Sequence, residues 1–136
     1  MRPAVGLSVA LLGAALAFAA VTLYALEGRE VVVVRTRAAD GSTRETRTWV
    51  ADDGTGVLIE AAFAERPFVQ DLLVNPVAEL ERGGSIYRYR AVIVPNPEGH
   101  VRIRALLAEK YGWADRWVGL LQDTSRSVAV RLEPAN

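Results

Sequence analysis

The residues best suited to bind a ligand are four arginines that fall within 13 residues of each other, Arg35, Arg37, Arg44 and Arg47. In this stretch only Asp40 and Glu45 offset their charge. A guanidinium presents a planar fork of N–H donors that matches phosphate or carboxylate oxygens. We therefore expect an anionic ligand at one end of this stretch. The alternative is that the arginines form the solvated side of a half-exposed hairpin.

The four arginines lie on two β-branched, alternating runs, Glu30–Arg37 and Thr43–Val50, which an Asp-Gly turn joins. Asp-Gly supplies the positive φ of a tight hairpin connection, so the pattern predicts a hairpin. On a regular strand Arg44 and Arg47 point to opposite faces, so they cannot both hold one ligand without a bulge or a strand end. Arg44 is the favoured ligand-binding residue of the two.

The remaining chain predicts a small, mainly β (α+β) domain. Four further strands are expected at Val57–Ala61, Val77–Glu81, Ser85–Val94 and Ser127–Leu132. Short helices are expected over Phe68–Val74, from the N-cap Asn96 to Gly112, and over Trp113–Leu121. The first strands should form a meander, and Tyr87, Tyr89, Ala91 and Ile93 should face the core. Six short strands close most simply into a barrel with helices on its rim.

Composition excludes several classes of function. The chain has 136 residues, 51% of them hydrophobic, and no net formal charge, so nothing indicates a nucleic-acid surface. It has no cysteine and a single histidine, His100, so neither a thiolate site nor a multi-histidine metal site can form. We predict no metal and no catalytic acid–base pair or nucleophile.

The N-terminal segment Ala4–Leu26 holds 23 residues without a charge. As a helix it would be about 35 Å long, enough to cross a hydrocarbon core of about 30 Å. The sequence thus predicts a membrane anchor over residues 1–28 and a barrel domain over residues 29–136. A cleaved signal peptide is the alternative. Basic residues after the segment outnumber Arg2, which favours a single-pass protein with a cytoplasmic barrel domain.

Several motifs resemble one known family in their order and spacing. They are Val33-Val34-Arg35-Thr36, the residues Gly41, Arg44, Thr46 and Trp49-Val50, the helix Phe68–Pro76 with its Leu-x-x-Asn-Pro ending, Tyr111–Asp115 and Val130–Pro134. Together they resemble the deazaflavin-dependent nitroreductase family, which are split β-barrel proteins akin to flavin-binding pyridoxamine-phosphate-oxidase-like barrels. The resemblance spans about three quarters of the chain.

The resemblance implies a reductase that binds coenzyme F420, or alternatively FMN, and passes hydride to a small acceptor of quinone or nitro type. In such enzymes the cofactor carries the chemistry, and the protein supplies phosphate anchors and a dry, flat slot. Carried over by position, the cofactor-binding residues are Thr36, Arg37, Gly41, Arg44, Ala62, Phe63 and Arg66. The acceptor-binding residues are Tyr111, Trp113 and Trp117. Members of such families often pair as homodimers around the cofactor cleft.

The chain departs from the family pattern in the turn Arg37–Gly41, where Asp40 stands among residues that are usually basic or small. A carboxylate beside a phosphate opposes binding by about 1 kcal/mol when partly exposed. Phe63 and Glu65 likewise replace small or polar residues. The alternative function is therefore a membrane-tethered split barrel that binds no redox cofactor and acts as an interaction module.

Overall fold

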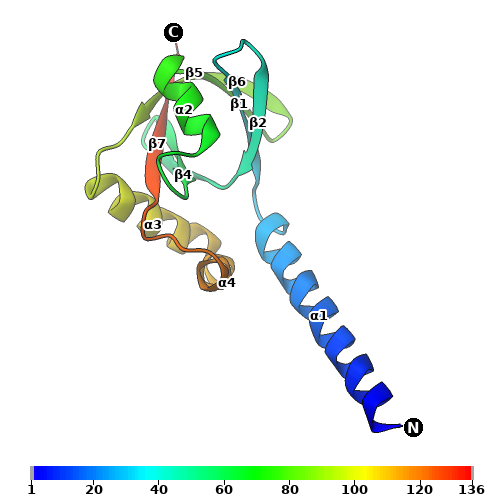
Figure 1. The fold of residues 1–136 in the computed structure, drawn as a ribbon. Helices are drawn as coiled ribbons and strands as arrows, with labels where there is room; N and C mark the ends of the chain where they lie inside the picture. The colour runs from blue at the N-terminus through cyan, green and yellow to red at the C-terminus, as the bar shows by residue number, and fades with distance from the viewer. Residues whose placement is uncertain (1, 136) are drawn as a thin grey trace.

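Seven antiparallel strands form one curled sheet in the order β2-β1-β5-β6-β7-β4-β3 (Figure 1). In this computed structural model, which describes residues 2–135, the strands are β1 Val32–Arg37, β2 Thr43–Thr48, β3 Val50–Asp53, β4 Gly56–Ala61, β5 Val77–Arg82, β6 Ser85–Ile93 and β7 Val128–Pro134. The helices are α1 Pro3–Glu27, α2 Pro67–Val74, α3 Glu98–Tyr111 and α4 Trp113–Leu121. α1 projects from the sheet domain, which confirms the predicted long apolar helix.

The two edge strands of the sheet, β2 and β3, are consecutive in the chain and only Trp49 separates them. β2 pairs with β1 and β3 pairs with β4, so the chain leaves one edge and starts the other within a single residue. A sheet with this connectivity has to curl until its edges approach at Trp49. The result is a barrel that is split between β2 and β3.

This connectivity corrects two predictions. The sheet has seven strands rather than six, because the expected strand Thr43–Val50 ends at Thr48 and a new strand begins at Val50. The expected meander is also wrong, since β4 pairs with β7 and β3 rather than with β2. The direct cause is the corner at Trp49, which carries the chain across the split instead of into a hairpin.

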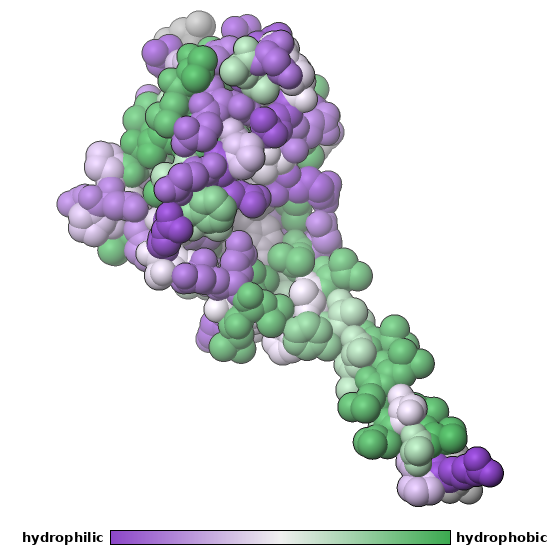
Figure 2. Space-filling view, viewed as in Figure 1, coloured by the Kyte–Doolittle hydropathy of each residue, from purple (hydrophilic) through white to green (hydrophobic). Residues whose placement is uncertain are grey.

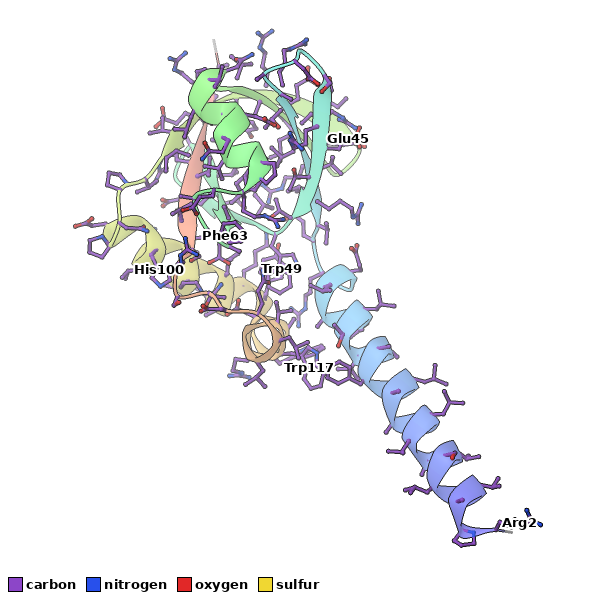
Figure 3. All side chains as sticks on the ribbon, viewed as in Figure 1. Arg2, Glu45, Trp49, Phe63, His100 and Trp117 are labelled. Atoms are coloured by element: carbon purple, nitrogen blue, oxygen red, sulfur yellow. The ribbon has the colours of Figure 1, made fainter. Side chains whose placement is uncertain are left out.

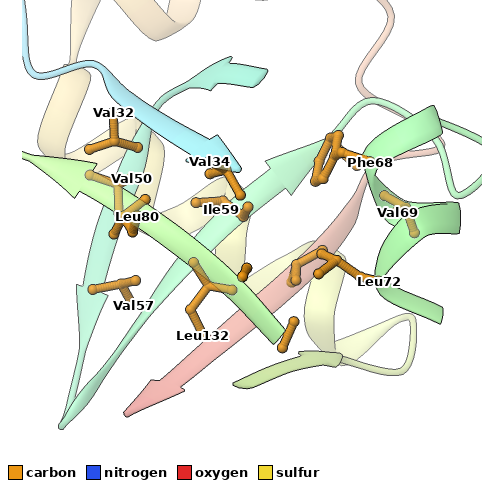
Figure 4. Close-up of a cluster of buried hydrophobic side chains, with 14 of the residues drawn as sticks. Val32, Val34, Val50, Val57, Ile59, Phe68, Val69, Leu72, Leu80 and Leu132 are labelled. Atoms are coloured by element: carbon orange, nitrogen blue, oxygen red, sulfur yellow. The ribbon is translucent and has the colours of Figure 1, made fainter. Parts of the chain in front are cut away.

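Two hydrophobic clusters lie on the two faces of the sheet. The inner cluster fills the barrel, where α2 contributes Phe68, Val69 and Leu72 (Figure 4). The outer cluster joins the sheet to α3 and α4 through Leu58, Ala129, Ile103, Leu107 and Tyr111. Both faces of β4 are therefore buried, which is why its sequence is almost continuously apolar.

The predicted helices and the predicted tyrosine face are confirmed in most respects. The N-cap of α3 is Pro97, one residue after the predicted Asn96, but the side chain of Asn96 still accepts a hydrogen bond from the His100 backbone N–H in the first turn, at 3.0 Å. Gly112, with φ of 55°, makes the corner between α3 and α4. On β6, Ala91 is buried and Tyr89 packs against the core, but Tyr87 is exposed because it lies near the open end of the strand.

One tyrosine fastens the corner at Trp49 to the rest of the domain. The fully buried Tyr111 hydroxyl donates to the Glu30 carbonyl oxygen at 2.7 Å and accepts from the Val50 N–H at 3.1 Å. Its ring stacks on Trp49, with centroids 4.2 Å apart and planes 9° from parallel. Burial raises the pKa of the Tyr111 hydroxyl, so it stays protonated and keeps its donor at neutral pH.

A group of four charged residues joins the start of the domain to the same region. The Arg82 guanidinium binds Glu30 at 2.9 Å and Asp52 at 2.7 Å, and the Lys110 ammonium binds Glu30 at 2.6 Å. Hydrogen bonds from Arg82, with a smaller contribution from Lys110 for Glu30, hold the pKa values of Glu30 and Asp52 below their ordinary values. The group links the segment after α1 to β3, β5 and α3.

Substitution of Tyr111 tests its contribution to stability. We expect Tyr111→Phe to lower the free energy of unfolding by about 1–3 kcal/mol, because the buried Val50 N–H and Glu30 carbonyl lose their partner. Urea unfolding of the full chain in detergent, followed by tryptophan fluorescence, measures this loss. The matched control Tyr87→Phe removes an exposed hydroxyl and should change stability by less than about 0.5 kcal/mol. Equal effects of the two substitutions would contradict the assignment.

The Arg82 group predicts a loss of stability in acid. The folded pKa values of Glu30 and Asp52 are depressed, so their contribution is present at neutral pH and is lost as the pH falls through those values. Arg82→Ala should destabilise the chain by about 1 kcal/mol at pH near 7 and by less as the carboxylates protonate below their ordinary values of 4.5 and 3.8. Urea midpoints across this range give the difference, and Arg90→Ala on the exposed face of β6 is the control. A stability difference between the unchanged chain and Arg82→Ala that grows in acid would refute the contribution of these ion pairs.

Candidate functional site

A cavity of about 340 Å³ lies where the end of β2, the corner at Trp49, the β4–α2 loop, α3 and α4 meet. Ligand pockets in proteins usually measure about 300–1,000 Å³, so this cavity is at the lower end of that range. Its walls are formed by Leu26, Glu27, Val31, Thr46, Arg47, Thr48, Trp49, Glu60, Ala61, Ala62, Arg66, Phe68, Arg104, Leu107, Asp115, Val118, Gly119, Gln122 and Thr124.

The cavity wall at α3 and α4 carries a charged triad. The Arg104 guanidinium donates to the Glu60 carboxylate at 2.9 Å and to the Asp115 carboxylate at 2.6 Å. Burial alone would lower the pKa of Arg104, but the bonds to Asp115 and the charge of Glu60 outweigh it, and the net shift is upward. Arg104 therefore stays charged, and its donors are already occupied by the protein.

The other two arginines of the cavity differ in their partners. Arg47 forms an ion pair with Glu27 of α1 at 2.5 Å. The exposed Arg66 guanidinium lies 5.8 Å from the centroid of the Phe63 ring. Within residues 2–135, Arg66 is the cavity-lining arginine that makes no ion pair with a carboxylate. Its fork of donors is thus available to an anionic group in the cavity.

The hairpin arginines that we expected to bind a ligand form hydrogen bonds and ion pairs within the protein. Arg35 binds Glu45 and Glu81, at 3.1 Å and 2.5 Å, and Arg37 donates to the Gly41 carbonyl at the tip of the hairpin, at 3.2 Å. The Arg44 Nε donates to the buried Asp71 carboxylate of α2 at 2.8 Å, and the Thr36 hydroxyl donates to the same oxygen at 2.7 Å. Asp71 lies too far along the chain for the hairpin sequence to indicate it.

The predicted cofactor-binding residues therefore occupy three separate places. Ala62 and Arg66 line the cavity. Thr36 and Arg44 both bond Asp71 of α2, and Arg37 and Gly41 lie at the hairpin tip. Phe63 belongs to the same β4–α2 loop as Ala62 and Arg66, and the guanidinium groups of Arg66 and Arg126 cover its ring.

The three aromatic residues predicted to bind the acceptor do not line the cavity either. Tyr111 is buried, and its hydroxyl bonds the Glu30 carbonyl oxygen. Trp113 stacks on Tyr24 of α1 at 5.8 Å, and Trp117 lies 5.5 Å from Phe18 of α1 (Figure 3). The aromatic rings that do line the cavity are Trp49 and Phe68. Both belong to the motifs that carry the family resemblance, but neither was predicted to bind a ligand.

No group of three or more His, Cys, Asp or Glu side chains suited to a metal ion occurs among the described residues 2–135. His100 makes its contacts with Ser127, whose hydroxyl oxygen lies 2.8 Å from the His100 Nδ1. The charged groups of the cavity consist instead of ion pairs and the unpaired Arg66.

No protein-family model matches the chain, and no curated protein matches it in sequence. Solved structures do match the fold. A conserved hypothetical protein from Mycobacterium tuberculosis is 20% identical, with a TM-score of 0.62, over 87% of this chain and 80% of that one. A putative pyridoxamine 5′-phosphate oxidase from Listeria innocua is 16% identical, with a TM-score of 0.60, over 84% and 90%. A structure described as an F420 reductase is 21% identical, with a TM-score of 0.55, over 84% and 93%.

These likenesses establish the fold. The chain has the split-barrel fold that also occurs in F420 reductases and pyridoxamine-phosphate-oxidase-like proteins. This confirms the fold expected from the motifs, with the strand number corrected to seven.

The coupling energy of the ion pair between Arg44 and Asp71 can be measured by a double-mutant cycle. Arg44→Ala should lower the free energy of unfolding by about 1 kcal/mol, because Arg44 is 41% exposed while its partner Asp71 is 7% exposed. In an Asp71→Asn background the same substitution should have almost no effect, and the coupling should be about 1 kcal/mol. Urea unfolding of the four full-length chains gives the coupling. A coupling near zero would show that Arg44 is free to bind a ligand.

Proposed function

We propose that this chain is a membrane-anchored reductase that binds coenzyme F420, or alternatively FMN, in the cavity beside Trp49. Hydride would pass to an acceptor of quinone or nitro type. The observation that carries the proposal is a cavity with one aromatic wall and one unpaired guanidinium, Arg66, in a fold shared with F420 reductases.

The residues present fit a flat ring that carries one anionic group. Trp49, Phe68, Leu107 and Val118 offer apolar surface to a ring and limit the access of water. Arg66 would bind a phosphate oxygen, and Ala62 leaves room for the ligand to approach the backbone of the β4–α2 loop. The bound deazaflavin or flavin would supply the hydride, and the protein binds and orients it.

The charged side chains that line the cavity sum to zero, because three arginines, Arg47, Arg66 and Arg104, stand against three carboxylates, Glu27, Glu60 and Asp115. The carboxylates engage Arg47 and Arg104, so Arg66 is the main attraction for an anion. The second function, a tethered module without a cofactor, would follow if this one guanidinium were too little to hold F420 or FMN.

The proposed membrane anchor is the reason to expect a lipophilic acceptor. α1 is long and apolar enough to span a membrane, and its apolar side chains are exposed. Leu26 and Glu27 at the end of α1 also line the cavity. A site beside the end of a membrane span is well placed to receive a quinone from the bilayer, because tethering raises the local concentration of the reaction partners. We place the barrel domain on the cytoplasmic side.

Cofactor binding is tested on the full chain in detergent or nanodiscs. We expect F420 or FMN fluorescence to change on titration, and Arg66→Ala to weaken binding about 10- to 100-fold, the loss of one charged hydrogen bond of about 1.5–3 kcal/mol. Arg66→Lys should restore part of the affinity. Arg44→Ala should change it little, since Asp71 already occupies Arg44.

The matched control is Arg88→Ala, which removes an exposed arginine of β6 outside the cavity. Absence of binding for both cofactors would overturn the reductase and leave the tethered module. Binding that Arg44→Ala abolishes and Arg66→Ala does not would move the cofactor to the site that the motifs first indicated.

A further inference from the structure

We propose that α4 is a second membrane-contacting element, lying in the membrane–water interface beside α1 with Leu120 and Leu121 among the lipid acyl chains. The proposal rests on the proposed anchoring by α1 and extends it from a tether to a seated domain. Its occupant is the lipid bilayer itself.

The packing of α4 against α1 fixes the depth of α4. Trp117 of α4 contacts Phe18 at 5.5 Å between ring centroids. Phe18 lies eight residues before Leu26, which is about 12 Å along the helix axis. The apolar segment of about 35 Å exceeds a hydrocarbon core of about 30 Å by only about 5 Å. Phe18 therefore lies about 7 Å or more inside the hydrocarbon even if all the excess is on the domain side, and Trp117 must enter with it.

The polar atoms at this contact are satisfied in a way that suits an apolar surrounding. The Trp117 indole N–H donates to the Thr22 hydroxyl at 3.0 Å, and that hydroxyl donates to the Phe18 carbonyl oxygen at 2.8 Å. An unpaired N–H or O–H in hydrocarbon would cost several kcal/mol.

The outer side of α4 is apolar where it leaves the protein. Leu120 and Leu121 are 82% and 50% exposed, next to Trp113 and Trp117 on the same side of the helix. Asp115, which binds Arg104, lies on the opposite side of the helix, and the buried Ala114 on its flank packs on the domain. Apolar surface runs from α1 onto the base of the domain near α4, whereas purple, hydrophilic residues cover much of the rest of the domain, apart from an apolar strip at its upper left (Figure 2).

A cation borders the apolar side. Arg116 is exposed, and its guanidinium makes no ion pair within residues 2–135. A long basic side chain at the edge of a membrane-inserted face reaches out to the headgroup phosphates while its stem stays in apolar surroundings. The side chains of α4 therefore have the order expected of a helix that lies in the interface.

The chain contains no cysteine, so single nitroxide labels can be placed without removing any native residue. Leu120→Cys, Leu12→Cys and Val74→Cys would be labelled in the full chain in nanodiscs of phosphatidylcholine and phosphatidylglycerol. Leu12 is in the middle of α1, and Val74 is an exposed apolar residue at the end of α2, at the other end of the domain. Power saturation measures the collision of each label with oxygen, which concentrates in lipid, and with a water-soluble nickel complex.

We expect the oxygen-to-nickel collision ratio at Leu120→Cys to resemble that at Leu12→Cys and to be severalfold higher than at Val74→Cys. A ratio at Leu120→Cys equal to that at Val74→Cys, with Leu12→Cys in lipid, overturns the seating of α4 and leaves the anchor intact. Exclusion of both reagents from Leu120→Cys means that a second copy covers α4, which also overturns the proposal. A water-exposed label at Leu12→Cys refutes the anchor itself, and with it the membrane part of the proposed function.

Discussion

The fold depends on the corner at Trp49, where the chain passes from one edge of the sheet to the other. Edge strands expose unpaired backbone groups, and a sheet with open edges tends to recruit other chains. Here the two edges are brought together by covalent connection, and the Tyr111 hydroxyl bonds the first residue of β3 to the segment before β1. The indole N–H of Trp49 donates to the Leu26 carbonyl of α1 at 3.1 Å, so the sheet, α3 and α1 are joined at one place.

The cavity is a consequence of that corner. Because β2 and β3 diverge from Trp49 instead of pairing, the inner face of the barrel opens beside them and α3 and α4 cover the gap only in part. Apolar and charged side chains therefore lie next to each other at the opening. The largely buried triad of Arg104, Glu60 and Asp115 neutralises its own charges within the protein, and Arg66 is left available for a ligand.

Local sequence patterns predict most of the helices and strands, whereas the features that depend on long-range contacts leave no local signal. Asp-Gly specified the first hairpin, and Asn96 with Gly112 marked the ends of α3. Nothing local marks the corner at Trp49, since no glycine or proline is present, so one strand was predicted where there are two. The ligand-binding role of Arg44 stays a prediction, and its partner Asp71 lies 27 residues away, too far for the hairpin sequence to indicate. Arg47 reaches the cavity because it lies near the end of β2. At a strand end the strict alternation of side chains between the two faces of a sheet no longer holds.

Only residues 28–31 separate the end of α1 from the start of β1. The Trp49 indole bonds the Leu26 carbonyl just before this segment, and the Tyr111 hydroxyl bonds the Glu30 carbonyl within it. A connection so short and so well fixed gives the barrel almost no freedom to swing relative to the helix that carries it. With α1 in a membrane, as we propose, the opening beside Trp49 would keep a constant height above the acyl chains as the molecule diffuses laterally. Encounters with a hydrophobic reactant would become a search in two dimensions, and their frequency would scale with the density of that reactant per unit area of membrane rather than per unit volume of the cell.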